Sequence, residues 1–225
     1  MARPTGYDDD ADPTERSSTP LWLEKALETG GATARLASQL RFVFELDKAK
    51  SVLRRTYVSD ASRLEDDAGH MWHAAVAALV LAEHSDEPVD VSRLVTMLAI
   101  HDIVEIDAGD TFIYDDTAMS KKHERERVAA DRLFGLLPDD QRAQLQSLWL
   151  EFEEGETATA RMAAAIDRLL PILLNRAVDG RTWAEHGVGA EAIFERNSGI
   201  DLGSHFLWSV ARSVLEHAEA DGLIA

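Results

Sequence analysis

The stretch Leu98-Ala99-Ile100-His101-Asp102-Ile103-Val104-Glu105 decides how this sequence is interpreted. Its apolar spacing predicts a helix over about 91–104 with Leu94 and Met97 facing inward, and a His-Asp pair interrupts that helix. Burying an ionised carboxylate is costly unless a cation meets it. Both side chains are long enough to converge on one ion, although adjacent residues of a helix diverge by about 100°. Two interpretations stay open: a divalent metal bound by imidazole and carboxylate, or a buried His-Asp hydrogen bond with no metal.

Helical spacing also recurs on both sides of this stretch. Leu36, Leu40, Val43 and Phe44 share one face of the first helix, and 74–81 is so apolar that it should be buried. Residues 54–68 are expected to form a loop, 105–119 are expected to be irregular, and Pro171 interrupts a later helix. Strand signals are scarce, so the predicted fold is all-α, an irregular helical bundle. The expected helices cover about 32–53, 70–84, 91–104, 121–134, 139–154, 157–175, 182–195 and 203–221.

Length and composition bound the organisation of the chain. It has 225 residues, of which 45% are hydrophobic, which suits one sizeable domain. Residues 1–31 start with an acidic, Pro- and Ser-containing stretch and are expected to be disordered or weakly ordered. Residues 32–225 are expected to form a single domain, with a C-terminal helical extension from about residue 180.

The charge and the absent residue types exclude several classes of function. The formal net charge is −18, which disfavours duplex nucleic acid because such binding depends on Lys and Arg neutralising phosphates. There is no cysteine, so thiolate ligands, thiol nucleophiles and disulfides are excluded. No apolar run is long enough for a membrane span, and the acidic start is unlike a signal peptide. A soluble, cytoplasmic protein is expected.

Two more residues are candidate ligands, although each is ambiguous by itself. His70 opens an apolar helix after Gly69 and is typical of a helix cap or a surface histidine. Asp167 lies on an apolar helix face and is equally able to pair with Arg168 or Arg161. The spacing alone does not bring either residue to the His-Asp pair.

The order His70, His101-Asp102, Asp167 resembles the signature of the HD-domain phosphohydrolases. Further segments resemble the branch that contains the 5′-deoxynucleotidases, and the likeness covers about 36–200. These segments are Gly109-Asp110-Thr111, Lys121-Lys122-His123-Glu124-Arg125-Glu126, Leu136-Leu137-Pro138, Leu148-Trp149 and Glu151-Phe152-Glu153.

The resemblance implies a chemistry and a set of roles. One divalent metal (Mn, Co, Zn, Ni, Fe or Mg) would be held by the four residues His70, His101, Asp102 and Asp167. Water bound to the metal would attack a phosphomonoester, plausibly a (deoxy)nucleoside 5′-monophosphate. Glu105 would orient or deprotonate that water, and Asp110 would lie near the sugar or the water. Arg54 or Arg55 would bind the phosphate. Members of this family are mostly homodimers.

Other interpretations of these residues remain open. Glu105 suits a salt-bridged helix end, Asp110 a turn, and the two arginines a solvated loop. The branch has a tryptophan near its phosphate-binding arginine that helps to reject a ribose 2′-hydroxyl, and Tyr57 is the nearest substitute here. His73, one turn after His70, is expected to face the substrate or to pack in the core.

Departures from the family pattern keep other functions open. Asp67 and Gly69 stand where the family has other residue types, so the choice of substrate is open. The alternatives are an HD-type hydrolase or phosphodiesterase acting on a non-nucleotide phosphate ester, or a non-catalytic binding protein stabilised by the metal.

Overall fold

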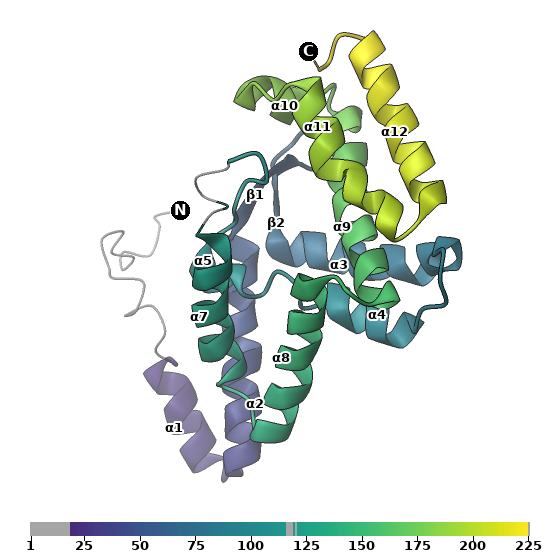
Figure 1. Cartoon of the computed structure of the whole chain (residues 1–225). Helices are drawn as coiled ribbons and strands as arrows, with labels where there is room; N and C mark the ends of the chain where they lie inside the picture. Colours follow the sequence, from purple (N-terminus) through teal and green to yellow (C-terminus); the bar gives the residue numbers. More distant parts are fainter. Residues whose placement is uncertain (1–18, 116–118, 120, 225) are drawn as a thin grey trace, which may run out of the picture.

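The structure is a computed structural model, and it describes residues 19–115, 119 and 121–224. It confirms the all-α prediction, with one small hairpin added (Figure 1). The α-helices are α1 (Leu21–Thr29), α2 (Ala34–Glu45), α3 (Asp67–Leu81), α4 (Val91–Leu98), α5 (Glu105–Ala108), α7 (Lys122–Phe134), α8 (Asp139–Glu154), α9 (Ala158–Ala177), α10 (Arg181–His186), α11 (Ala190–Asn197) and α12 (His205–Ala220). Short 3-10 segments, η2 (Leu46–Ser51), η3 (Ala82–His84) and η4 (Ser198–Leu202), connect some of them within the described residues.

The hairpin corrects the expected loop over 54–68. Strand β1 (Leu53–Tyr57) pairs antiparallel with β2 (Leu64–Asp66), with Leu53 opposite Asp66 and Tyr57 opposite Leu64. The same region ends the first helix early, because η2 tightens the chain and Val52 is already extended. Asp66 then caps α3, since its side chain accepts a hydrogen bond from the Gly69 N–H at 2.8 Å.

The predicted helix over 91–104 is wrong in its last turn. Helix α4 ends at Leu98, and His101 and Asp102 lie in a turn. The ring of His101 donates from Nδ1 to the Leu98 carbonyl at 2.9 Å. In a continued helix that carbonyl would accept from the N–H of Asp102. A side chain that takes the last carbonyl therefore ends the helix and turns the chain toward α5.

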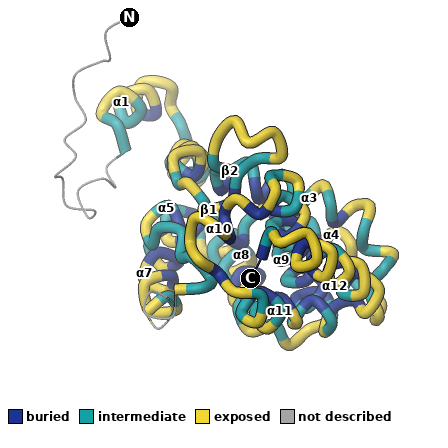
Figure 2. Tube along the Cα trace, turned by 90° about the horizontal axis from the view of Figure 1, so that it is seen from above, coloured by how far each residue is buried: buried dark blue, intermediate teal, exposed yellow. Residues whose placement is uncertain are grey.

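Helix α9 is the central element of the packing. It contacts α3, α4, α8, α12 and β1 (Figure 1), and ten of its residues are buried (Figure 2). The core has two apolar clusters: one surrounds α9, and a smaller one contains Phe134 and Trp149. Leu98 belongs to the first cluster, whereas Ile103 and Val104 belong to the second. The turn that carries His101 and Asp102 therefore crosses from one cluster to the other.

One predicted apolar face is exposed, and a second stretch is less buried than expected. Leu36, Leu40, Val43 and Phe44 do share a face of α2, but they are exposed, Val43 at 60%. The stretch 74–81 is buried only at Ala74 and Ala78, while Leu79 and Val80 are 61% and 63% exposed. Helix α3 packs on α4 and α9 through one side only, so an apolar composition all round does not bury the other side.

Glycines divide the C-terminal extension more than the sequence indicated. The expected helix over 182–195 is two helices, α10 and α11, because Gly187 adopts a φ of 60°. Of the expected weakly ordered segment 1–31, Leu21–Thr29 form α1, and residues 1–18 lie outside the described residues. Within the described part of the chain, no helix is both long and apolar enough to cross a membrane.

We expect Ser204→Ala to destabilise the fold by about 1–2 kcal/mol, because it removes a cap and a buried hydrogen bond. Ser204 is fully buried; its hydroxyl accepts from the Leu207 N–H at 3.1 Å and donates to the His84 carbonyl at 2.5 Å. Urea unfolding would measure the loss. Ser209→Ala, at an exposed position of α12, is the control. Equal stabilities of the two variants would contradict the role of Ser204.

Candidate metal centre and active site

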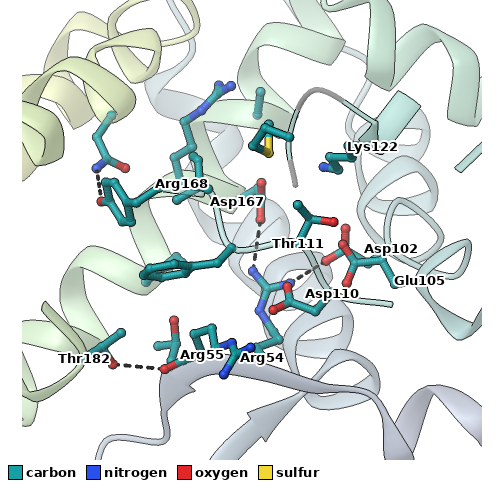
Figure 3. Close-up of a pocket in the computed structure, with 18 of the residues that line it drawn as sticks. Arg54, Arg55, Asp102, Glu105, Asp110, Thr111, Lys122, Asp167, Arg168 and Thr182 are labelled. Atoms are coloured by element: carbon teal, nitrogen blue, oxygen red, sulfur yellow. Dashed lines mark hydrogen bonds and ion pairs between the residues drawn. The ribbon is translucent and has the colours of Figure 1, made fainter. Parts of the chain in front are cut away.

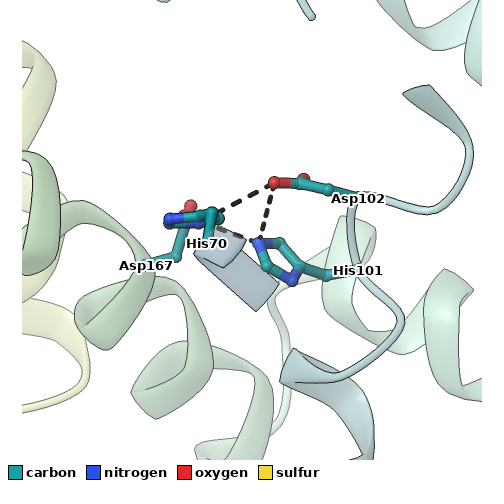
Figure 4. Close-up of side chains that lie close together, drawn as sticks. All are labelled: His70, His101, Asp102 and Asp167. Atoms are coloured by element: carbon teal, nitrogen blue, oxygen red, sulfur yellow. Dashed lines mark hydrogen bonds and ion pairs between the residues drawn. The ribbon is translucent and has the colours of Figure 1, made fainter. Parts of the chain in front are cut away.

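Four side chains from three parts of the chain meet at one point: His70 from α3, His101 and Asp102 from the turn after α4, and Asp167 from α9 (Figure 4). The His70 Nε2 lies 2.8 Å from Asp167 Oδ1, and the His101 Nε2 lies 3.1 Å from Asp102 Oδ2. One ligand atom from each of the four residues lies within 4.8 Å of the others. The structure thus brings together the four residues whose spacing alone did not place them together.

The two imidazoles are oriented as metal ligands usually are. His101 uses Nδ1 for the Leu98 carbonyl, and His70 directs Nδ1 toward Glu65 Oε2 at 3.4 Å. Both rings therefore present Nε2 to the cluster, where the buried His101 Nε2 lies 3.1 Å from Asp102 Oδ2 and 3.5 Å from Asp167 Oδ1. A histidine ligand typically gives its second nitrogen to a carbonyl or carboxylate in this way. The donor set fits a divalent metal ion.

Electrostatics at this point favour a cation. Burial alone would lower the pKa of His101, yet Asp102 and Asp167 raise it to about 10. Burial alone would raise the pKa of Asp167, yet the neighbouring His101 and His70 hold it well below its usual range. The negative potential that retains a proton on His101 also favours a divalent ion, which would take the place of protons on the ligands.

Arg54 is the buried counter-charge of the cluster. From β1 its Nη1 donates to Asp102 Oδ2 at 2.7 Å, and its Nη2 lies 4.0 Å from Asp167 Oδ1 (Figure 3). Its Nε lies 3.6 Å from Glu65 Oε2. Burial opposes its charge, but Asp102, Asp167, Glu105 and Asp110 raise its pKa, so Arg54 stays protonated. A hairpin that the sequence did not predict therefore places this arginine.

A second group of carboxylates lies beside the first. One oxygen each from Asp67, Glu105 and Asp110 lies within 4.8 Å of the others. Burial, and then the charges of Asp102 and Asp67, raise the pKa of Glu105 well above its usual range. Its Oε2 has no hydrogen-bond partner among the described residues. Such a carboxylate is suited to accept a proton.

These groups open into a pocket of about 300 Å³ (Figure 3). Its lining includes five carboxylates (Asp102, Glu105, Asp110, Glu153 and Asp167) and four Lys or Arg side chains (Arg54, Arg55, Lys122 and Arg168). The formal net charge of these nine side chains is −1, and one bound divalent ion would change it to +1. The whole chain, in contrast, carries −18. With a bound divalent ion, the pocket of this acidic protein would therefore be locally positive, which suits an anionic substrate.

The expected substrate-binding residues do not all reach this pocket. Arg54 and Arg55 line it, but Tyr57 and His73 are not among its lining residues. The Tyr57 hydroxyl donates to Glu185 Oε2 at 3.1 Å, and the Arg181 guanidinium lies 4.0 Å from the centre of its ring. His73 lies half-buried on α3.

Several lining residues had no assigned role in the sequence. Lys122 lies in the segment 121–126, which resembles the family. Trp183 lies in the C-terminal extension, for which no chemical role was predicted. Arg168 directly follows a predicted ligand. A helical signal was available for Asn175, because it lies two turns beyond Asp167 on the same face of α9.

Comparisons with known proteins agree with this geometry. A sequence profile described as HD domain matches residues 46–205. The chain is 32% identical over 137 residues to the 5′-deoxynucleotidase HDDC2 of Homo sapiens, covering 60% of this chain and 66% of that protein. It is 33% identical over 149 residues to the Bos taurus protein of the same name, covering 66% and 70%.

A solved structure is also similar. The crystal structure of a predicted metal-dependent phosphohydrolase from Magnetospirillum magnetotacticum MS-1 has a TM-score of 0.82 and 50% sequence identity. The match covers 85% of this chain and 96% of that chain.

A buried carboxylate beside the pocket leads to a prediction about pH. Glu126 of α7 is 3% exposed, and burial raises its pKa to about 7 although Lys122 Nζ lies 3.4 Å from its Oε1. In the unfolded chain the pKa of a glutamate side chain is about 4.3. The folded state therefore binds more protons between these values, so Glu126 lowers the free energy of unfolding as pH rises through them, with no further change above about 7.

We expect Glu126→Gln to flatten this decline, because glutamine does not ionise. Urea unfolding at a series of pH values from about 5 to 8 would measure it. Glu219→Gln, on the exposed side of α12, should leave the wild-type profile unchanged. Parallel profiles for the Glu126→Gln variant and the wild type would contradict the raised pKa.

Proposed function

We propose, starting from the fact that this chain belongs to the HD-domain family, that it is a metal-dependent phosphohydrolase that cleaves a phosphomonoester, a (deoxy)nucleoside 5′-monophosphate in particular. The observation that carries the proposal is the convergence of His70, His101, Asp102 and Asp167 beside the buried Glu105, whose Oε2 has no hydrogen-bond partner among the described residues. The names of the similar proteins, a 5′-deoxynucleotidase and a metal-dependent phosphohydrolase, support the same reaction.

In this proposal the four converging residues hold one divalent ion, of which Mn, Co, Zn, Ni, Fe and Mg all accept such ligands. When bound, the ion supplies Lewis acidity toward a phosphoryl oxygen and makes a neighbouring water more acidic. Glu105 accepts the proton of the attacking water. Burial, and then the charges of Asp102, Asp67 and Asp110, raise the pKa of Glu105, which strengthens it as a base.

The cationic side chains of the pocket bind the phosphate. The planar guanidinium of Arg54, already aimed at the cluster, matches two phosphate oxygens. Lys122 adds a second positive charge: burial opposes it, but Glu126, Asp102 and Glu153 raise its pKa. The reaction forms a bond from the water oxygen to phosphorus, breaks the ester P–O bond, and yields an alcohol and inorganic phosphate.

A cytoplasmic location and a homodimer belong to the same proposal. The absence of cysteine fits a reducing compartment. Two exposed apolar stripes support self-association: Leu36, Leu40 and Val43 on α2, and Trp72, Val76, Leu79 and Val80 on α3. Contiguous apolar patches on a folded domain commonly mark interfaces.

The deciding experiment measures phosphate release and bound metal together. Wild-type protein with Mn²⁺ or Co²⁺ should release phosphate from deoxynucleoside 5′-monophosphates. Asp102→Ala should lose both the metal and the activity, whereas Glu105→Gln should keep the metal and lose about 100- to 10,000-fold in kcat. Asp47→Ala, at an exposed position outside the pocket, is the control. Metal-loaded wild type that hydrolyses no nucleotide would refute the nucleotidase assignment.

We expect the wild type to sediment as a dimer, and a buried charge in the correct stripe to dissociate it. Val43→Glu tests the stripe on α2 and Leu79→Glu tests the stripe on α3, each by sedimentation velocity. A monomeric wild type, or a dimer that survives both substitutions, would show that these stripes are not the interface.

A further inference from the structure

The pocket has a second end, which the proposed hydrolysis does not use. Along α9, Asp167, Pro171 and Asn175 recur at four-residue spacing on one face, and all three line the pocket. Eight residues of helix rise by about 12 Å. Asn175 therefore marks a point well removed from the metal-binding cluster.

This second end is mainly aromatic and has no carboxylate among its lining residues. Phe112, Tyr114 and Trp183 line it, and the rings of Phe112 and Tyr114 meet edge-on with their centres 5.2 Å apart. The Asn197 amide donates to the Tyr114 hydroxyl at 3.2 Å. The five carboxylates of the lining lie at or next to the catalytic end. Asp102 and Asp167 belong to the metal-binding cluster, and the charge of Asp102 raises the pKa of the other three, Glu105, Asp110 and Glu153.

Asn175 is the residue at this end that lacks a partner. It is 4% exposed, and its Oδ1 has no hydrogen bond within the described part of the chain. Its backbone carbonyl, in contrast, accepts from the Gly180 N–H at 2.8 Å. A buried unsatisfied amide oxygen is costly, and a half-turn of the amide exchanges its acceptor and donor. The group is therefore ready to bond a ligand through either atom.

The C-terminal extension holds this end in place. Thr182 of α10 donates from Oγ1 to the Arg55 carbonyl of β1 at 3.1 Å (Figure 3). This bond fixes the start of α10, and thereby Trp183, next to the strand that carries Arg54. The extension thus supplies Trp183 from α10 and Asn197 from α11 to the wall of the pocket.

We propose that Phe112, Tyr114, Trp183 and Asn175 form a subsite for a flat nitrogen heterocycle at the end of the substrate opposite the phosphate. Aromatic side chains bind such a ring by stacking, and an amide reads the polar edge of the ring. A flexible alkyl group would leave Asn175 unsatisfied, and a bare sugar phosphate would leave this end of the pocket unfilled. The inference rests on the proposed function, and it assigns a nucleobase-like group to a particular set of residues.

The test compares thymidine 5′-monophosphate with 2-deoxyribose 5-phosphate, in which a hydroxyl replaces the base at C1′. Wild type should favour the nucleotide by about tenfold or more in kcat/KM, since stacking of one base contributes about 1–3 kcal/mol. Asn175→Leu and Phe112→Leu should each lose most of that preference, measured as the ratio of kcat/KM for the two substrates. Gln144→Leu, an amide-to-leucine change at an exposed position of α8, is the matched control.

A binding measurement separates this inference from the proposed function. Free thymidine, which has no phosphate to release, should bind wild type in calorimetry and bind Asn175→Leu at least about fivefold more weakly. If no nucleotide is hydrolysed but thymidine binds in this residue-dependent way, the subsite stands and the hydrolase assignment fails. Equal use of both substrates by wild type, unchanged preference in both variants, or no thymidine binding would overturn the subsite.

Discussion

Burial of charge is the constraint on which this structure depends. His70 and His101 are almost fully buried, and with them lie the carboxylates of Asp102 and Asp167 and the guanidinium of Arg54. Ionised groups in an apolar interior are tolerated only when each meets an opposite charge or a metal ion. The helices must therefore hold these side chains within hydrogen-bonding distance. The convergence of α3, β1, α9 and the turn after α4 satisfies that requirement.

The position of this cluster between two apolar cores follows from one side chain. The ring of His101 takes the Leu98 carbonyl, so α4 ends and the chain crosses from the core around α9 to the core around Phe134. The same hydrogen bond fixes which ring nitrogen faces the cluster. A single local contact thus sets both the path of the backbone and the orientation of a proposed ligand.

Sequence reasoning reached the helices and the four converging residues, but not their surroundings. The predicted bounds of α7, α8 and α9 agree with the structure to within about two residues, because Gly135, Pro138 and Gly155 separate these helices. Periodicity failed at 99–104, where a side chain competes for a backbone carbonyl, and at 54–66, where a short hairpin has little alternation to detect. It also could not distinguish a buried apolar face from an exposed one, as on α2 and α3. Tyr57 and His73 were chosen by nearness in sequence, and neither lines the pocket. Asn175 was indicated only by its helical spacing from Asp167, and Trp183 reaches the pocket through the placement of α10.

The hydrogen bond between Thr182 and the Arg55 carbonyl has a consequence for how the parts of the molecule influence one another. It joins α10 to the strand that carries Arg54, so local opening of the extension and the position of this arginine are not independent. This coupling is reciprocal. A ligand that contacts both ends of the pocket stabilises the closed extension, and closure of the extension strengthens the binding of the ligand by the same free energy. Ligand binding at the catalytic end is thereby coupled to the stability of the last fifth of the chain, although that segment supplies none of the charged groups there.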